Sequence, residues 1–222
     1  MHGITRTRNR DNVEQSKLKA ASTLYANKCN QIYSKNVDEL SLNDLSDIGE
    51  VLSISPENST LWNLRKRIIL RYLNELQQSK SDDLKNDSDQ DEERLNIFKN
   101  ELRFNAVCLS QNPKSYASWF HRKWCLQAMD NATLLEEMDI CKEYLSRDER
   151  NFHCWAYWYF LTNEINLLTP EQCLAFVTEK LIENFSNYSA WHYRSMLLAN
   201  NSSLLQFSSA VDKVLGFTID GS

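Results

Sequence analysis

The feature that most restricts the fold of this chain is a short motif centred on tryptophan that occurs four times. The segments PENSTLWNLRKRIIL, NPKSYASWFHRKWCL, DERNFHCWAYWYFL and FSNYSAWHYRSMLL align on Trp62, Trp119, Trp155 and Trp191. The last two intervals between these tryptophans are both 36 residues, whereas the first is 57. A fixed period of this length is typical of stacked repeats, in which each unit buries its apolar face against its neighbours.

Each repeat contains two helical segments. Before the third tryptophan, apolar residues recur at spacings of three or four, the period of one helix face: Leu134, Met138, Cys141 and Leu145. Thr169 and Gln172 form a capping box, with Pro170 at the first helical position. The chain has only 4 Gly and 3 Pro, which leaves few places for tight hairpin turns. We therefore predict an all-α fold, an alpha–alpha superhelix (solenoid) of antiparallel helical hairpins.

The first interval is longer because of an acidic segment at 79–93. This segment, SKSDDLKNDSDQDEE, has no aromatic residue and buries too little apolar surface to offset the entropy lost on ordering. We predict a disordered insertion there. Residues 1–20 are expected to form a flexible N-terminal arm, and residues 21–222 a helical-repeat domain that ends in an incomplete fifth repeat at about 204–222.

Composition and charge narrow the classes of function. A net charge of −5 and a pI of about 5.5 argue against a general nucleic-acid binder. No apolar run approaches the roughly 18–20 residues that a membrane-spanning helix needs, and no signal-peptide core follows the first methionine. The six cysteines are widely spaced without a CxxC pair, which is typical of reduced, buried thiols. We expect no nucleic-acid partner, no membrane span and a cytoplasmic location.

The motif also contains an arginine, three residues after the tryptophan. Three copies have it, at Arg65, Arg122 and Arg194, whereas the third has Trp158. Residues three apart share a helix face. A buried tryptophan covers about 150–250 Å², roughly 4–6 kcal/mol of gross burial at ~25 cal/mol per Å². We predict structural roles for both residues, with the arginine stacking on an indole or binding a carboxylate or carbonyl, and Trp158 packing around Tyr157 and Tyr159.

The motif resembles the repeat of protein prenyltransferase alpha subunits, in which an Asn-x3-Trp-x2-Arg core recurs at this spacing. Asn58, Asn151 and Asn187 supply the asparagine in three copies, and Ser115 replaces it in the second. No copy has the glycine that follows the tryptophan in tetratricopeptide repeats. The segments STLWNLRK, NPKSYASWFHRKW, DERNFHCW and NFSNYSAWHYRS, with the MHG start, are most similar to the Rab geranylgeranyltransferase branch of the family. The resemblance extends from about residue 1 to residue 198, apart from the insertion.

This resemblance implies a subunit that acts only together with a separate beta subunit, which holds the catalytic zinc (Zn) and most of the isoprenoid pocket. The reaction would transfer a geranylgeranyl group from geranylgeranyl diphosphate to C-terminal cysteines of Rab GTPases. A Rab escort protein, docked on the alpha subunit, would present the Rab GTPase substrate.

Candidate site residues follow from the charge that develops in this reaction. Negative charge builds on the departing diphosphate, so the site needs positive charge and hydrogen-bond donors, and helix N-termini favour anions. Lys114 and Tyr116, five and three residues before Trp119, match the family positions that face the diphosphate. His153 is a candidate second donor, with a packed interface histidine as the alternative. Phe152 lacks the hydroxyl that farnesyltransferase alpha subunits have at that position.

The N-terminus supplies a further candidate, His2. The resemblance implies that this histidine reaches the zinc of the beta subunit as a removable ligand. A neutral imidazole suits the open position of a catalytic zinc. The alternative is a terminal histidine without a role.

Two other functions stay open at this point. One is a non-catalytic helical-repeat scaffold that binds protein partners, and the other is a truncated isoform that binds the beta subunit without activity. The next tryptophan would fall at position 227, beyond Ser222. A fragment or truncated form of a longer protein therefore stays among the alternatives.

Overall fold

The computed structural model describes residues 8–78, 87–129, 135–201, 203–205 and 216. Every regular element among them is helical. In chain order these elements are α1 (Arg8–Ser34), η1 (Val37–Glu39), α2 (Asp44–Ile54), α3 (Ser59–Gln78), α4 (Asp87–Gln111), α5 (Tyr116–Gln127), α6 (Leu135–Arg147), α7 (Phe152–Tyr159), η4 (Phe160–Glu164), α8 (Pro170–Glu183) and α9 (Tyr188–Asn200). The predicted all-α class of paired helices is confirmed. None of the described helices is both long enough and apolar enough to cross a membrane.

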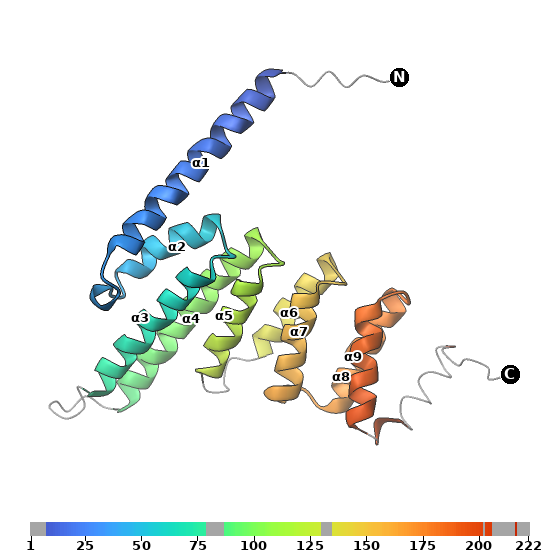
Figure 1. Ribbon diagram of the computed structural model, residues 1–222. Helices are drawn as coiled ribbons and strands as arrows, with labels where there is room; N and C mark the ends of the chain where they lie inside the picture. The colour runs from blue at the N-terminus through green and yellow to red at the C-terminus, as the bar shows by residue number, and fades with distance from the viewer. Residues whose placement is uncertain (1–7, 79–86, 130–134, 202, 206–215, 217–222) are drawn as a thin grey trace. The chain divides into compact units, whose positions relative to one another are not determined.

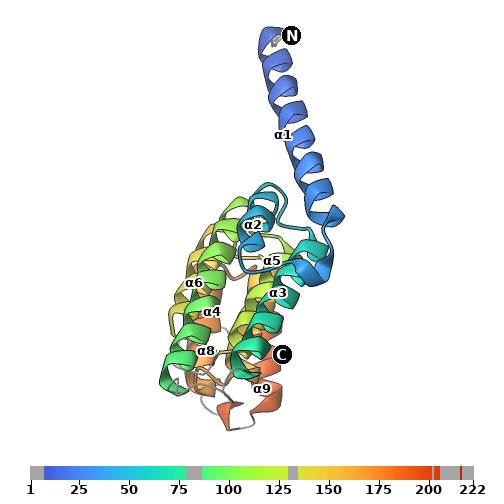
Figure 2. The same ribbon diagram turned by 90° about the vertical axis from the view of Figure 1, so that its left-hand side faces the viewer.

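The chain divides into two compact units, residues 1–129 (unit 1) and 130–222 (unit 2). In unit 1, α4 and α5 form a hairpin, and α3 packs against α2, α4 and α5. The C-terminal half of α1 buries Cys29 and Ile32 in the core with α2, while its N-terminal part extends beyond the other helices of the unit (Figures 1 and 2). The tryptophan helices of this unit are α3 and α5.

Unit 2 consists of the hairpins α6–α7 and α8–α9, and α7 also packs against α9. The helix α8 begins with the predicted capping box: Thr169 Oγ1 accepts from the backbone N–H of Gln172, and Gln172 Oε1 accepts from that of Thr169. The helix α7 continues into the π-helix η4, which ends at Glu164. Asn166, two residues later, has a φ of 57°, a left-handed conformation that asparagine tolerates. The core of this unit is rich in aromatic residues.

Two predicted boundaries need correction. Residues 8–20, expected to be part of a flexible arm, belong to α1, because Arg8–Ser34 contains no glycine or proline that would interrupt a helix. Residues 87–93, expected in the disordered insertion, form the start of α4, and Tyr72 Oη donates a hydrogen bond to the Glu93 carboxylate. Residues 79–86 lie outside the described part of the chain, as does most of the predicted fifth repeat.

The four motif tryptophans differ in burial, and this difference predicts unequal effects on stability. Trp62, Trp119 and Trp155 are buried, whereas Trp191 in the last hairpin is half-buried. Trp155→Ala should lower the free energy of unfolding by about 3–5 kcal/mol, because it empties a fully enclosed site. Trp191→Ala should cost clearly less in the same denaturant titration. Equal losses for the two variants would contradict the partial exposure of Trp191.

Candidate functional site

The loops that lead into the tryptophan helices repeat one local geometry. Asn112 Oδ1 accepts a hydrogen bond from the backbone N–H of Lys114 at 3.1 Å. Equivalent turns, in which a side-chain oxygen binds the N–H two residues later, form at Asp148 and at Asn184. Such Asx turns reverse the chain in few residues. Each turn therefore delivers the next motif residue to the start of its helix.

The asparagine of the motif, four residues before the tryptophan, is an N-cap. In all four copies its side-chain oxygen accepts from the backbone N–H three residues later, at 3.1–3.2 Å; the capping residues are Asn58, Ser115, Asn151 and Asn187. Asparagine and serine are both preferred at this position, because either side chain satisfies an N–H that the helix leaves unpaired. The replacement by Ser115 therefore preserves the function of the motif.

The motif tryptophans make a second repeated contact, which the sequence pattern did not predict. Each indole Nε1–H donates to the carbonyl six residues earlier, at 2.8–2.9 Å; the pairs are Trp62 with Pro56, Trp119 with Pro113, Trp155 with Glu149 and Trp191 with Phe185. The hydrogen bond satisfies the indole N–H while the ring is buried. Each tryptophan thus fastens its helix to the loop that precedes it.

Two of these carbonyls also bind the following hairpin. The Pro56 carbonyl accepts from Ser115 Oγ at 3.0 Å, and the Glu149 carbonyl accepts from Asn187 Nδ2 at 3.1 Å. The N-cap residue of one repeat therefore binds the loop of the repeat before it. In these two junctions, a single carbonyl therefore accepts the indole N–H of its own repeat and the side chain that caps the tryptophan helix of the next repeat.

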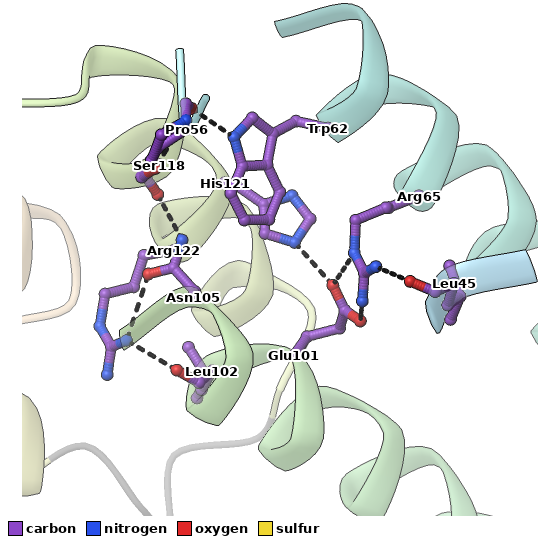
Figure 3. A network of polar contacts seen from close by, with 10 residues as sticks. All are labelled: Leu45, Pro56, Trp62, Arg65, Glu101, Leu102, Asn105, Ser118, His121 and Arg122. Atoms are coloured by element: carbon purple, nitrogen blue, oxygen red, sulfur yellow. Dashed lines mark hydrogen bonds and ion pairs between the residues drawn. The ribbon is translucent and has the colours of Figure 1, made fainter. Parts of the chain in front are cut away.

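The motif arginines are buried and structural, as predicted. Arg65 binds both carboxylate oxygens of Glu101 and donates to the Leu45 carbonyl (Figure 3). Its guanidinium also lies 4.4 Å from the centre of the Phe104 ring. Arg122 donates to the Leu102 carbonyl at 3.1 Å. In unit 2, Arg194 donates to Thr178 Oγ1 at 2.6 Å. The arginines hold the tryptophan helices against the helices that precede or follow them.

Trp158 takes the arginine position in the third repeat. Its ring stacks on Phe176 at 5.4 Å and meets Trp155 edge-on at 5.7 Å, so these ring partners differ from the predicted Tyr157 and Tyr159. The position that holds the carboxylate partner of the arginine changes too. Two repeat lengths after Glu101, this position is occupied by Cys173. Since both members of the ion pair are replaced, no unpaired charge is buried at this junction.

A buried polar network supports the start of α5 (Figure 3). His121 Nε2 lies 3.0 Å from Glu101 Oε2, and the imidazole is fully buried against Trp62, with ring centres 4.3 Å apart. Burial alone would raise the pKa of Glu101, but the hydrogen bonds from His121 and Arg65 outweigh it, so the pKa is lowered. Burial lowers the pKa of His121 despite the opposing effect of Glu101. Glu101 is therefore ionised and His121 neutral near pH 7, with Nε2–H donating.

Lys114 and Tyr116 lie together at the N-terminus of α5. Lys114 is exposed in the loop, and Tyr116 is the first residue of the helix, with 63% of its surface exposed. The Tyr116 ring stacks on Phe120 at 6.2 Å with an interplanar angle of 10°, and its backbone N–H donates to Glu57 Oε1 at 2.9 Å. An ammonium and a phenol beside the positive end of a helix dipole are suited to an anion.

His153 lies in unit 2 as the second residue of α7 and is half-buried. Phe152 precedes it at the position that Tyr116 holds in unit 1, and its ring is 68% exposed. His2 lies outside the described residues. Over the described part of the chain, no group of three or more His, Cys, Asp or Glu side chains is placed to hold a metal ion.

A comparison with known protein families matches three of these repeats. Residues 98–129, 134–165 and 170–201 match the profile described as "Protein prenyltransferase alpha subunit repeat". Each range contains one tryptophan helix, and the copy around Trp62 lies outside them.

Relatives extend the similarity to most of the chain. "Geranylgeranyl transferase type-2 subunit alpha" of Sus scrofa and that of Homo sapiens are each 35% identical to it over 202 residues, which is 89% of this chain and 33% of the relative. The chain therefore spans about a third of the length of these relatives. A chain in the solved structure "Candida albicans protein geranylgeranyltransferase-I complexed with GGPP" has the same fold, with a TM-score of 0.57 and 21% identity, over 88% of this chain and 62% of that chain.

The buried network predicts a large effect of Glu101→Gln on stability. The substitution removes the counter-charge of Arg65 inside the protein and should lower the free energy of unfolding at pH 7 by on the order of 3–5 kcal/mol. Glu143→Gln is the matched control, because Glu143 pairs with Arg147 on an exposed face of α6; it should cost about 0.5 kcal/mol or less. Similar costs for the two variants in urea titrations would contradict a buried ion pair.

The same network predicts a pH dependence. The pKa of His121 is lower in the folded than in the unfolded chain, so the unfolded chain binds the additional proton as the pH falls below about 6.5. Folding stability should therefore decrease between pH 7 and pH 5, by at most about 1.4 kcal/mol per pH unit from this group. His121→Gln keeps an N–H donor for Glu101 and removes the titration. Its stability should decrease less over this range, and an unchanged slope would contradict a buried neutral His121.

Proposed function

This chain belongs to the family of proteins built from protein prenyltransferase alpha subunit repeats, and on that premise we propose that it serves as the alpha subunit of a heterodimeric protein geranylgeranyltransferase. The support is the 35% identity to type-2 alpha subunits over 89% of the chain, together with the shared helical fold. The proposed reaction transfers geranylgeranyl from geranylgeranyl diphosphate to C-terminal cysteines of Rab GTPases. The proposed partners are a beta subunit, a Rab escort protein and the Rab substrate.

The proposal divides the chemistry between the two subunits. The beta subunit would hold the zinc. A substrate cysteine bound to this zinc would be deprotonated, and its thiolate would be the nucleophile. The thiolate forms a carbon–sulfur bond as the carbon–oxygen bond to the diphosphate breaks, and the electron pair leaves with the diphosphate. The contribution of this chain is to bind and stabilise that leaving group.

The observation that carries this proposal is the pair Lys114 and Tyr116 at the N-terminus of α5. Lys114 is exposed and Tyr116 presents most of its ring to solvent, so both side chains are accessible to a ligand. The Lys114 ammonium and the Tyr116 hydroxyl would donate to diphosphate oxygens, where charge develops in the transition state. Ser115 fixes the loop between them, since it caps α5 and binds the Pro56 carbonyl.

His153 is proposed as a second donor from the start of α7. Phe152, at the position equivalent to Tyr116, has no hydroxyl, so in the third repeat the donor at the start of α7 would be the imidazole of His153. His2 is proposed as a displaceable ligand of the zinc in the beta subunit, which would block the site until substrate binds.

The proposal predicts a specific defect for Lys114→Ala. In a reconstituted heterodimer, this variant should fold, bind the beta subunit and bind the prenyl donor. Its single-turnover rate of prenyl transfer at saturating donor should fall by about 10- to 1000-fold, because one preorganised charge is lost from the transition state. Lys114→Arg should restore only part of the rate, since the planar guanidinium places its charge differently.

Lys142→Ala is the matched control, because Lys142 is exposed on α6 and pairs with Asp139. It removes the same charge from another surface and should leave the rate unchanged. A Lys114→Ala heterodimer that transfers the prenyl group at the wild-type rate would rule out the role of Lys114. Equal losses for both variants would indicate an effect of net charge instead.

A further inference from the structure

Lys66 on α3 is a half-buried cation with no carboxylate partner within the described part of the chain. Its ammonium lies 4.7 Å from the centre of the Phe120 ring and 5.3 Å from that of Trp124. Among the ion pairs of the described residues, none involves Lys66. The neighbouring Arg65, in contrast, is fully paired with Glu101.

The environment of Lys66 disfavours its charge. Burial is the main cause that lowers the pKa of this amine. The carboxylate of the neighbouring buried network cannot serve as its counter-charge, because Glu101 is already bound by Arg65 and His121. Aromatic rings offset only part of the lost hydration of an ammonium. A carboxylate brought from outside the chain would supply the missing counter-charge.

Exposed apolar side chains surround this cation. Phe120 is 54% exposed and stacks on Tyr116, while Leu70 lies one helical turn after Lys66 on α3 and is 46% exposed. We call this surface the Lys66 patch; it consists of Lys66, Leu70, Tyr116, Phe120 and Trp124. Exposed aromatic residues around a poorly hydrated cation are typical of the energetically important part of protein interfaces.

We propose that the Lys66 patch is a docking surface for the beta subunit, and that it receives a segment of that subunit presenting a carboxylate beside an apolar side chain. This inference rests on the proposed function, which places Tyr116 at the diphosphate. Because Tyr116 also belongs to the patch, the subunit that completes the site must approach this surface. A second copy of the chain fits less well, since a two-fold contact here would bring two Lys66 ammonium groups together.

The charge of Lys66 is tested in the assembled heterodimer. Lys66→Met keeps an unbranched chain over the rings and removes the charge, and it should weaken binding of the beta subunit by about 10- to 100-fold. Lys66→Arg should retain most of the affinity, and the matched control Lys142→Met should retain all of it. Circular dichroism and thermal melting establish that each variant is folded before affinity is compared.

Crosslinking tests the position of the patch independently of Lys66. Photoreactive benzoylphenylalanine at position 120 should crosslink to the beta subunit, and the same group at the exposed Val107 of α4 should not. If Lys66→Met binds as tightly as wild type, or position 120 crosslinks only to a second copy of this chain, the docking surface is overturned while the proposed function stands. If the wild-type chain binds no beta subunit, both proposals fail.

Discussion

The repeat structure depends on a loop carbonyl that accepts hydrogen bonds from two successive hairpins, as at Pro56 and at Glu149. At Pro56 it accepts from the indole of Trp62 and from the hydroxyl of Ser115 in the next hairpin. The Glu149 carbonyl accepts in the same way from Trp155 and Asn187. A buried polar group that loses its partner costs about 1–3 kcal/mol. Each junction therefore favours one register of helix against loop, and a hairpin displaced by one residue would lose both bonds.

The candidate site is held in place by these same bonds. Ser115, which lies between Lys114 and Tyr116, caps α5 and contacts the preceding loop, while Glu57 binds the backbone N–H of Tyr116. Beneath this loop, Arg65 and Glu101 tie α3 to α4. The exposed donors thus project from a rigid support. This is the arrangement expected of groups that stabilise charge in a transition state, since they need no reorganisation when the charge develops.

Much of the fold follows from the periodicity of the sequence, because a 36-residue repeat with capping signals leaves few alternatives to stacked hairpins. The indole-to-carbonyl bond was not predictable from residue types, although its constant six-residue spacing is present in every copy. The burial of His121 was not predictable either, because it depends on contacts of α5 with Trp62 of α3 and Glu101 of α4. Residues 8–20 were expected in a flexible arm, but they belong to α1, which no glycine or proline interrupts.

The site could be predicted in part. Their distance from Trp119 predicted that Lys114 and Tyr116 lie where the chain enters the tryptophan helix, and the structure has Tyr116 as the first residue of α5; their roles stay predictions. The Lys66 patch was not predictable, since it combines α3 with α5 across a separation of about fifty residues of sequence. Which surface lysines lack a carboxylate partner depends on long-range packing, and no local pattern encodes it.

The central claim is that this chain is the alpha subunit of a two-subunit enzyme, and co-expression with a prenyltransferase beta subunit tests it most directly. We expect a stable heterodimer in a one-to-one ratio, which transfers a radiolabelled geranylgeranyl group to an escort-bound Rab protein, while neither subunit does so alone. Recovery of this chain without the beta subunit, or a heterodimer that transfers no geranylgeranyl group, would contradict it.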